Sequence, residues 1–330
     1  MDSDNLNYHS VGKTVFEENL KNNKFADYRH QWVENPRKYI VSKFPLHLDI
    51  ESTNVCNLKC PYCAAAKGNW GNKNLGFMDF GLFKKIIDEA SSEGCYCVKF
   101  SLRGEPMLHP KLLNMIKYTV DSGIIDCYFN TNGMLLTEDT INKIIETGLP
   151  RLSISIDGWD KTSFEKNRLG ANYDIICKNI ENLIKIRKKY NVTRPKLRIQ
   201  TVMLPEIREH WDEYVNNWSD IADEIGFLDA REETPGVDHR GNISKGFSCP
   251  FLWQRMTILW DGTLLPCLMH GVDDFKLMSF GNVKNILIKN AWNSSQEDYY
   301  RNLHKTSRSH ELEACDKCSY RAMEIKKLTS

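Results

Sequence analysis

The sequence lacks an excess of charge of either sign, and it lacks segments that would direct a chain into or across a membrane. Its 330 residues contain 44 Lys and Arg against 43 Asp and Glu. This balance gives no electrostatic reason to expect binding to nucleic acid or to an anionic membrane. The amino terminus, MDSDNLNYHS, has neither the basic start nor the apolar core of a signal peptide, and no apolar run approaches the length of a membrane span. We therefore expect a soluble, cytoplasmic protein.

Cysteine, in contrast, is abundant. In a chain without a secretory signal, cysteines are expected to bind metal or to stay reduced. Seven of the eleven fall into two groups with ligand-like spacing, namely Cys56, Cys60 and Cys63, then Cys249, Cys267, Cys315 and Cys318. The other four are Cys95, Cys97, Cys127 and Cys177.

From residue 46 onward the sequence alternates between strand and helix patterns. Apolar residues at every second position of LHLDIE predict a strand, and helical spacing of Phe83, Ile86, Ile87 and Ala90 predicts a helix capped by Asp79. Such alternation favours a parallel sheet with right-handed crossovers. Strands are expected within 46–51, 97–102, 127–133, 151–158, 197–203 and 224–230.

The first cysteine group has the spacing C-x3-C-x2-C and directly follows the first predicted strand. Cysteine sulfur favours zinc and iron–sulfur clusters. Structural zinc normally takes a fourth ligand, so zinc or a disulfide is the alternative here. With Tyr62 before the last cysteine, the group resembles the signature of the radical S-adenosylmethionine (SAM) superfamily. In that family the three cysteines hold a four-iron four-sulfur cluster, and its open iron chelates SAM.

The resemblance implies an α/β fold, a partial (β/α)6 barrel of radical SAM type with its active site at the carboxyl ends of the strands. SLRGEP resembles the family's GEP motif. TNG and SISIDG resemble its third- and fourth-strand motifs, and Arg168 matches an R-x-G segment that tends to contact the SAM carboxylate. The expected SAM-binding residues are Tyr62, Gly104, Glu105, Pro106, Asn132, Ser153, Ser155, Asp157, Arg168 and Gln200.

The second cysteine group resembles the auxiliary-cluster domain called SPASM or, in its short form, twitch. Gly262 to Cys267 supply a G-x4-C segment, and Cys315 and Cys318 close the set of four. One fully ligated auxiliary four-iron cluster is expected, with structural zinc as the alternative. The domains predicted are a leader at 1–44 that packs outside the main domain, the barrel at 45–235 and the auxiliary domain at 236–330.

The resemblance also implies the chemistry. An electron from the first cluster cleaves SAM to a 5'-deoxyadenosyl radical, which removes hydrogen from an unactivated carbon. A flavodoxin- or ferredoxin-type reductant is expected to supply that electron. The phrases FPLHLDIESTNVCNLKCPYC and SLRGEPMLHPKL resemble radical SAM proteins of surface-polysaccharide biosynthesis. We therefore expect a sugar, nucleotide-sugar or aminocyclitol substrate, oxidised to a ketone with the auxiliary cluster as electron acceptor.

Several residues are candidates for proton or hydrogen transfer. Arg151 is a candidate hydroxyl-orienting residue, Glu232 a candidate base, and Cys97 or Cys127 a candidate hydrogen donor if the enzyme is instead an epimerase. A peptide-modifying radical SAM enzyme and a non-enzymatic zinc or redox-sensing protein are further alternatives. Other candidate substrate contacts are Arg103, Asp229, Arg231, Glu233 and His239.

Overall fold

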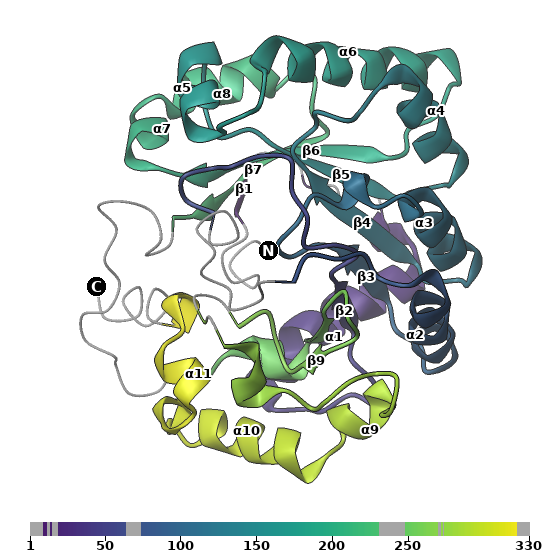
Figure 1. The fold of residues 1–330 in the computed structure, drawn as a ribbon, viewed down its shortest axis with the longest axis vertical. Coiled ribbons are helices and arrows are strands. Elements are labelled where there is room, and N and C mark those ends of the chain that lie inside the picture. Colours follow the sequence, from purple (N-terminus) through teal and green to yellow (C-terminus); the bar gives the residue numbers. More distant parts are fainter. Residues whose placement is uncertain are drawn as a thin grey trace.

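The computed structural model describes residues 9–11, 14, 19–63, 74–230, 248–269, 272 and 274–321. Within these ranges the strands form one nine-stranded sheet in the order β1-β7-β6-β5-β4-β3-β2-β8-β9 (Figure 1). The strands are β1 (His9–Val11), β2 (His47–Ile50), β3 (Cys97–Phe100), β4 (Asp126–Thr131), β5 (Arg151–Ser155), β6 (Lys196–Met203), β7 (Glu224–Asp229), β8 (Arg255–Ile258) and β9 (Leu264–Leu265).

The strands β2 to β7 pair in parallel, each with its neighbour in the sequence. They are the six strands that the sequence predicts, and they confirm the expected α/β barrel fold. The helices are α1 (Asn23–Lys38), α2 (Phe80–Ser92), α3 (Leu112–Asp121), α4 (Glu138–Glu146), α5 (Lys161–Asn167), α6 (Tyr173–Lys189), α7 (Pro205–Glu209), α8 (Trp211–Trp218), α9 (Ile288–Trp292), α10 (Ser295–Lys305) and α11 (Glu313–Asp316).

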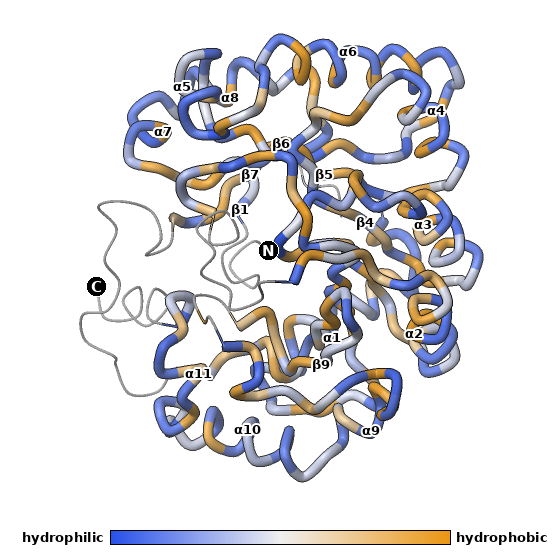
Figure 2. The backbone as a smooth tube through the Cα atoms, in the orientation of Figure 1, coloured by the Kyte–Doolittle hydropathy of each residue, from blue (hydrophilic) through white to orange (hydrophobic). Residues whose placement is uncertain are grey.

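The helices α2, α3, α4 and α6 cover the outer side of the sheet (Figure 1). On α2 the predicted apolar face is confirmed, since Phe83, Ile86, Ile87 and Ala90 are all buried in the main core. Asp79 caps this helix by accepting a hydrogen bond from the backbone N–H of Leu82 at 2.8 Å. Figure 2 shows hydrophobic and hydrophilic segments alternating along these helices, as expected for helices with one buried face.

The amino-terminal segment does not lie outside the main domain, so that prediction is wrong for its described residues. The strand β1 pairs antiparallel with β7 and thereby joins the sheet. On α1, the aromatic side chains of Phe25, Tyr28 and Trp32 are buried against Leu46 and Cys97. The reason is hydrophobic: these rings cover the amino-terminal end of β3, which would otherwise expose apolar surface to water.

The C-terminal region extends the barrel sheet. The strand β8 pairs in parallel with β2, and β9 pairs antiparallel with β8. The helices α9 to α11 lie beside these strands (Figure 1). The helices α10 and α11 carry part of a second, smaller core, whereas α9 packs into the main core. The predicted domain boundary at 235 falls outside the described residues and stays a prediction. Within the described ranges, no helix has the length and apolar character needed to cross a bilayer.

Candidate active site

The three-cysteine loop directly follows β2, at the carboxyl edge of the parallel strands. Cys56 is exposed, and Cys60 and Cys63 are half-buried. Burial raises the pKa of Cys60 to about 11, whereas the nearby Arg168 guanidinium lowers it, and the other two thiols of the group raise it further. The three thiols thus lie near one another beside a cation, which stabilises thiolates. This donor set fits three-point ligation of an iron–sulfur cluster.

The GEP turn packs against the backbone that leads into the cysteine loop. A Cβ atom on Gly104 would press against the carbonyl oxygen of Thr53 and lie 2.6 Å from that of Val55, so only glycine permits this approach. The Glu105 carboxylate accepts hydrogen bonds from the Thr131 hydroxyl at 2.7 Å and from the backbone N–H of Asn132 at 2.8 Å. Burial raises the pKa of Glu105, and these donors oppose the rise. Pro106 is buried at the start of the following turn.

The TNG segment at the end of β4 connects back to the same loop. The Asn132 side-chain amide donates to the Asn57 side-chain oxygen at 2.7 Å, and Asn57 lies between the first two cysteines. Sequence reasoning missed Asn57, because an asparagine between metal ligands carries no spacing signal. Together Glu105 and Asn132 tie the ends of β3 and β4 to the cluster loop.

A buried ion pair lies beside the cysteines on the other side of the loop. Asp157 accepts hydrogen bonds from Arg168, with Nε at 2.9 Å and Nη2 at 2.8 Å, and from the backbone N–H of Val202 at 2.9 Å. The pKa of Arg168 is raised, because Asp157 and the nearby Cys60 and Cys63 outweigh the lowering effect of burial. The predicted contacts of Asp157 and Arg168 with SAM stay predictions. The structure places the Arg168 guanidinium near Cys60 and Cys63 of the cysteine loop.

Tyr62 extends the same network. Its hydroxyl donates to the side-chain oxygen of Asn167, whose amide nitrogen donates to the backbone carbonyl of Asp157 at 3.0 Å. Burial raises the pKa of Tyr62 to about 12, with Glu206 and Asp157 adding to the rise. The phenol is therefore a hydrogen-bond donor at neutral pH.

Closer to the amino-terminal ends of the strands, Ser153 and Ser155 lie on β5, and Gln200 lies on the neighbouring strand β6. Ser153 is paired in register with Asn130 and Arg198, whereas Ser155 is in register with Gln200. Ser153 and Gln200 line a cavity inside the barrel. Their predicted contact with SAM stays a prediction, because Ser153 lies four residues below Asp157 along its strand, about 13 Å at the usual rise.

The two candidate thiol donors do not face a substrate, so their predicted role is wrong. Cys127 is fully buried in the hydrophobic core between the sheet and its helices. Cys97 is fully buried against the aromatic side chains of α1 at the amino-terminal end of β3, the end opposite the cysteine loop. Strand alternation explains the first result, because Tyr128 and Asn130 line the barrel cavity and Cys127 must then point outward.

Arg151, the candidate hydroxyl-orienting residue, forms a buried ion pair. Its Nε and Nη2 atoms donate to Asp126 at 2.9 and 2.5 Å, and its guanidinium lies 3.9 Å from the centre of the Tyr128 ring. It stands at the first residue of β5, remote from the carboxyl edge. Arg151 nevertheless lines the cavity inside the barrel, and its role in orienting a substrate hydroxyl stays a prediction.

Two of the remaining candidate substrate contacts lie within the residues that the structure describes. Arg103 is buried and donates to both carboxylate oxygens of Glu51 at 2.6 Å, so its predicted contact with substrate is not supported. Asp229 pairs with His9 at 3.0 Å. The predicted base Glu232 lies outside the described residues, as do Arg231, Glu233 and His239.

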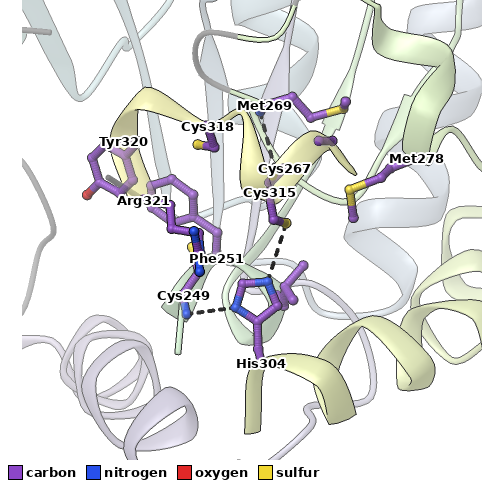
Figure 3. Close-up of a pocket in the computed structure, with 12 residues that line it drawn as sticks. Cys249, Phe251, Cys267, Met269, Met278, His304, Cys315, Cys318, Tyr320 and Arg321 are labelled. Atoms are coloured by element: carbon purple, nitrogen blue, oxygen red, sulfur yellow. Dashed lines mark hydrogen bonds between the residues drawn. The ribbon is translucent and has the colours of Figure 1, made fainter. Parts of the chain in front are cut away.

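The second cysteine group lies in the C-terminal region around one cavity (Figure 3). Cys249, Cys267, Cys315 and Cys318 all line this cavity, and no disulfide joins them. Burial raises the pKa of Cys267 well above its usual value, and the other three thiols raise it further. Four cysteines around one cavity, which His304 and Arg321 also line, fit the donor set of a fully ligated cluster.

The fold and these two sites define the class of protein: a partial parallel barrel with a three-cysteine SAM-cluster loop and an appended four-cysteine cluster domain. The family model of the Radical SAM superfamily matches residues 50–216, and the SPASM iron–sulfur cluster-binding domain matches residues 249–319. The chain therefore belongs to the Radical SAM superfamily. Membership of these families implies that it binds SAM, a four-iron cluster and an auxiliary cluster, as expected.

Known proteins resemble the chain over most of its length. It is 24% identical to the tungsten-containing aldehyde ferredoxin oxidoreductase cofactor-modifying protein of Pyrococcus furiosus, over 83% of this chain and 87% of that protein. The crystal structure of BtrN in complex with AdoMet and 2-DOIA matches with a TM-score of 0.53 and 21% identity, covering 84% and 93% of the two chains. Native anSMEcpe with bound AdoMet gives 0.59 and 18%, covering 84% and 88%.

His304 is a residue of the auxiliary site that sequence reasoning missed, because a single histidine before a cysteine pair has no diagnostic spacing. Its Nδ1 accepts from the backbone N–H of Cys249 at 3.1 Å, and its Nε2 lies 3.4 Å from Sγ of Cys315 (Figure 3). Since Nδ1 is the acceptor, the proton of the neutral ring is on Nε2 and points at the sulfur. Burial lowers the pKa of His304 to about 4, and Arg321 lowers it further.

Replacing His304 with Leu is expected to lower the reduction potential of the auxiliary cluster by about 40 mV, the equivalent of one hydrogen bond of about 1 kcal/mol. A hydrogen bond to a ligand sulfur favours the reduced, more negative cluster. Redox titration followed by electron paramagnetic resonance measures the change. His310→Leu is the control, because His310 is exposed on the neighbouring turn. An unchanged potential in His304→Leu would show that the ring does not interact with the cluster.

Proposed function

We propose that this radical SAM enzyme oxidises a hydroxyl-bearing carbon of a sugar, nucleotide sugar or aminocyclitol to a ketone. The observation that carries the proposal is the convergence of four cysteines on one cavity in the C-terminal region, a site for the electron acceptor that such an oxidation needs. The likeness to BtrN, whose crystal structure contains AdoMet and 2-DOIA, supports a small-molecule substrate.

When bound, SAM and the two clusters supply the one-electron chemistry: a hydrogen atom leaves the carbon, the hydroxyl proton goes to a base, and one electron goes to the auxiliary cluster. The chain's own residues prepare this chemistry. Gly104 allows the turn after β3 to approach the cysteine loop, and Glu105 and Asn132 hold that loop in place. Asp157 orients Arg168 toward the cysteines. Polar side chains inside the barrel, among them Asn130 and Gln200, face the space where a polyol would lie.

The distribution of thiols favours oxidation over epimerisation. All eleven cysteines lie within the described ranges. Of the four outside the two ligand groups, Cys95, Cys97 and Cys127 are buried, and Cys177 lies on α6 against the outer core. None of these four lines the cavity inside the barrel, where a hydrogen donor to the substrate would be needed.

The test uses anaerobically reconstituted enzyme with a flavodoxin or a chemical reductant, SAM, and a panel of nucleotide sugars and aminocyclitols. We expect 5'-deoxyadenosine together with a product two mass units lighter than its substrate. Cys318→Ala should abolish the lighter product, whereas the matched control Cys177→Ala should retain it. A product of unchanged mass that gains one unit in deuterated water would identify an epimerase and contradict the proposal.

A further inference from the structure

The barrel interior holds one cation, Lys99, that has no ion-pair partner among the described residues. Its inward-facing arginines each have a partner within ion-pair distance, namely Arg151 with Asp126, Arg198 with Glu224, and Arg255 with Asp49. Lys99, on the inner face of β3, forms no ion pair with any described residue. Its ammonium lies 5.6 Å from the centre of the Tyr128 ring. Burial lowers the pKa of Lys99, and Asp49, which is not within ion-pair distance, opposes this shift.

Unpaired hydrogen-bonding groups surround Lys99 in the same cavity. The hydroxyl of Ser153 is buried and has no hydrogen-bond partner among the described residues. The Gln200 side-chain oxygen accepts from Arg198 Nε at 3.3 Å, which leaves its amide nitrogen as a donor. Lys99, Asn130, Ser153 and Gln200 all line this cavity. A buried hydroxyl without a partner is costly unless a ligand satisfies it.

The register of the strands places this cavity nearer to the amino-terminal ends of the strands than Asp157 and Arg168, the predicted SAM contacts. Lys99 is level with Tyr128, and Asn130 is level with Ser153. Asp157, which holds Arg168 at the cysteine loop, follows Ser153 by four residues, about 13 Å along the strand. A substrate anchored in the cavity would therefore extend toward the cysteine loop.

We propose that this cavity binds an anionic group of the substrate, a phosphate or a carboxylate, with Lys99 supplying the charge and Ser153 and Gln200 supplying hydrogen bonds. The inference rests on the proposed function and narrows it to acidic or phosphorylated carbohydrates. An anion here would pair with Lys99 and satisfy the Ser153 hydroxyl. Charge-assisted hydrogen bonds of this kind contribute roughly ten- to a hundredfold in affinity.

The experiment measures binding without turnover, so its result is independent of the mass analysis above. The enzyme, with both clusters and SAM, is titrated calorimetrically with inorganic pyrophosphate, glucose 1-phosphate, glucuronate and neutral methyl glucoside. We expect at least one anionic probe to bind about tenfold or more tightly than the neutral sugar. Preference for the phosphates or for glucuronate would identify the group. Equal affinity of all probes would overturn the proposal.

Variants locate the site. Lys99→Met should lose the preference for the anion, whereas Lys185→Met, on the exposed side of α6, should keep it. Removing an unpaired charge should not lower the melting temperature, and iron content confirms that both clusters are loaded. Ser153→Ala is a second, smaller change, expected to weaken anion binding about fivefold. If Lys99→Met and Ser153→Ala both bind the anion as tightly as the wild type, the cavity is not the anion site.

Discussion

Replacing Arg103 with Met is expected to lower the free energy of unfolding by about 3–5 kcal/mol, the cost of leaving a buried charge without its partner. Arg103 and Glu51 are both buried and share two hydrogen bonds of 2.6 Å. The Arg103 guanidinium also lies 4.9 Å from the centre of the Phe275 ring, in the C-terminal region. The substitution would therefore loosen the barrel and its neighbouring domain together. Urea denaturation followed by circular dichroism measures the change.

The same pair offers an internal control through a double variant. Glu51→Gln combined with Arg103→Met removes both charges, so it should destabilise the protein less than the sum of the two single variants. Arg308→Met is the surface comparison, because the Arg308–Glu311 pair has similar distances but is exposed, and it should change stability little. If Arg103→Met behaved like Arg308→Met, the buried pair would not hold the two regions together.

Replacing Gly104 with Ala is expected to remove most of the iron from the first cluster site while leaving the auxiliary site filled. The added methyl group would press against the carbonyl oxygens of Thr53 and Val55. These are backbone atoms and cannot rotate away, and overpacking of this kind costs about 1–3 kcal/mol or more. Val55 directly precedes Cys56 and also accepts the backbone hydrogen bond of Glu105 at 2.8 Å. Relief of the clash would therefore displace the first cluster ligand.

Iron and sulfide analysis of anaerobically reconstituted protein gives the readout, and equilibrium dialysis with SAM gives a second one. Gly81→Ala is the control, because Gly81 lies in α2 and its added methyl group would meet only the end of the Asp79 side chain. Full iron content and unchanged SAM binding in Gly104→Ala would show that the turn does not support the cluster loop.

Local sequence patterns predict the barrel well because each unit buries its own apolar face. The spacing of Phe83, Ile86 and Ile87 identifies α2, and the glycine after α3, Gly123, has the positive φ of a helix end. The cysteine loop and the GEP turn are recognisable because their chemistry requires particular residues at fixed spacing. These features lie within single segments, so no knowledge of long-range contacts is needed.

The features that sequence reasoning misses depend on contacts between distant segments. The sequence of residues 9–11 does not predict their pairing with β7, because a three-residue strand is too short to show a periodic pattern. Strand alternation alone does not say which side of a strand faces the barrel interior. That ambiguity explains the wrong placement of Cys127, since the described barrel interior is polar and the apolar Cys127 and Phe129 pack outward. His304 meets Cys315 only through packing of α10 on α11.

The pairing of β8 with β2 affects the order in which the molecule can assemble. His47 of β2 is in register with Arg255 of β8, so the first barrel strand receives its second neighbour only after most of the chain has been synthesised. Domains fold from the amino terminus during translation, and an unpaired strand edge recruits strands from other chains. A nascent barrel thus carries its cysteine loop beside an open edge. The C-terminal region covers that edge by pairing β8 with β2, so the edge is open only until this region has been made.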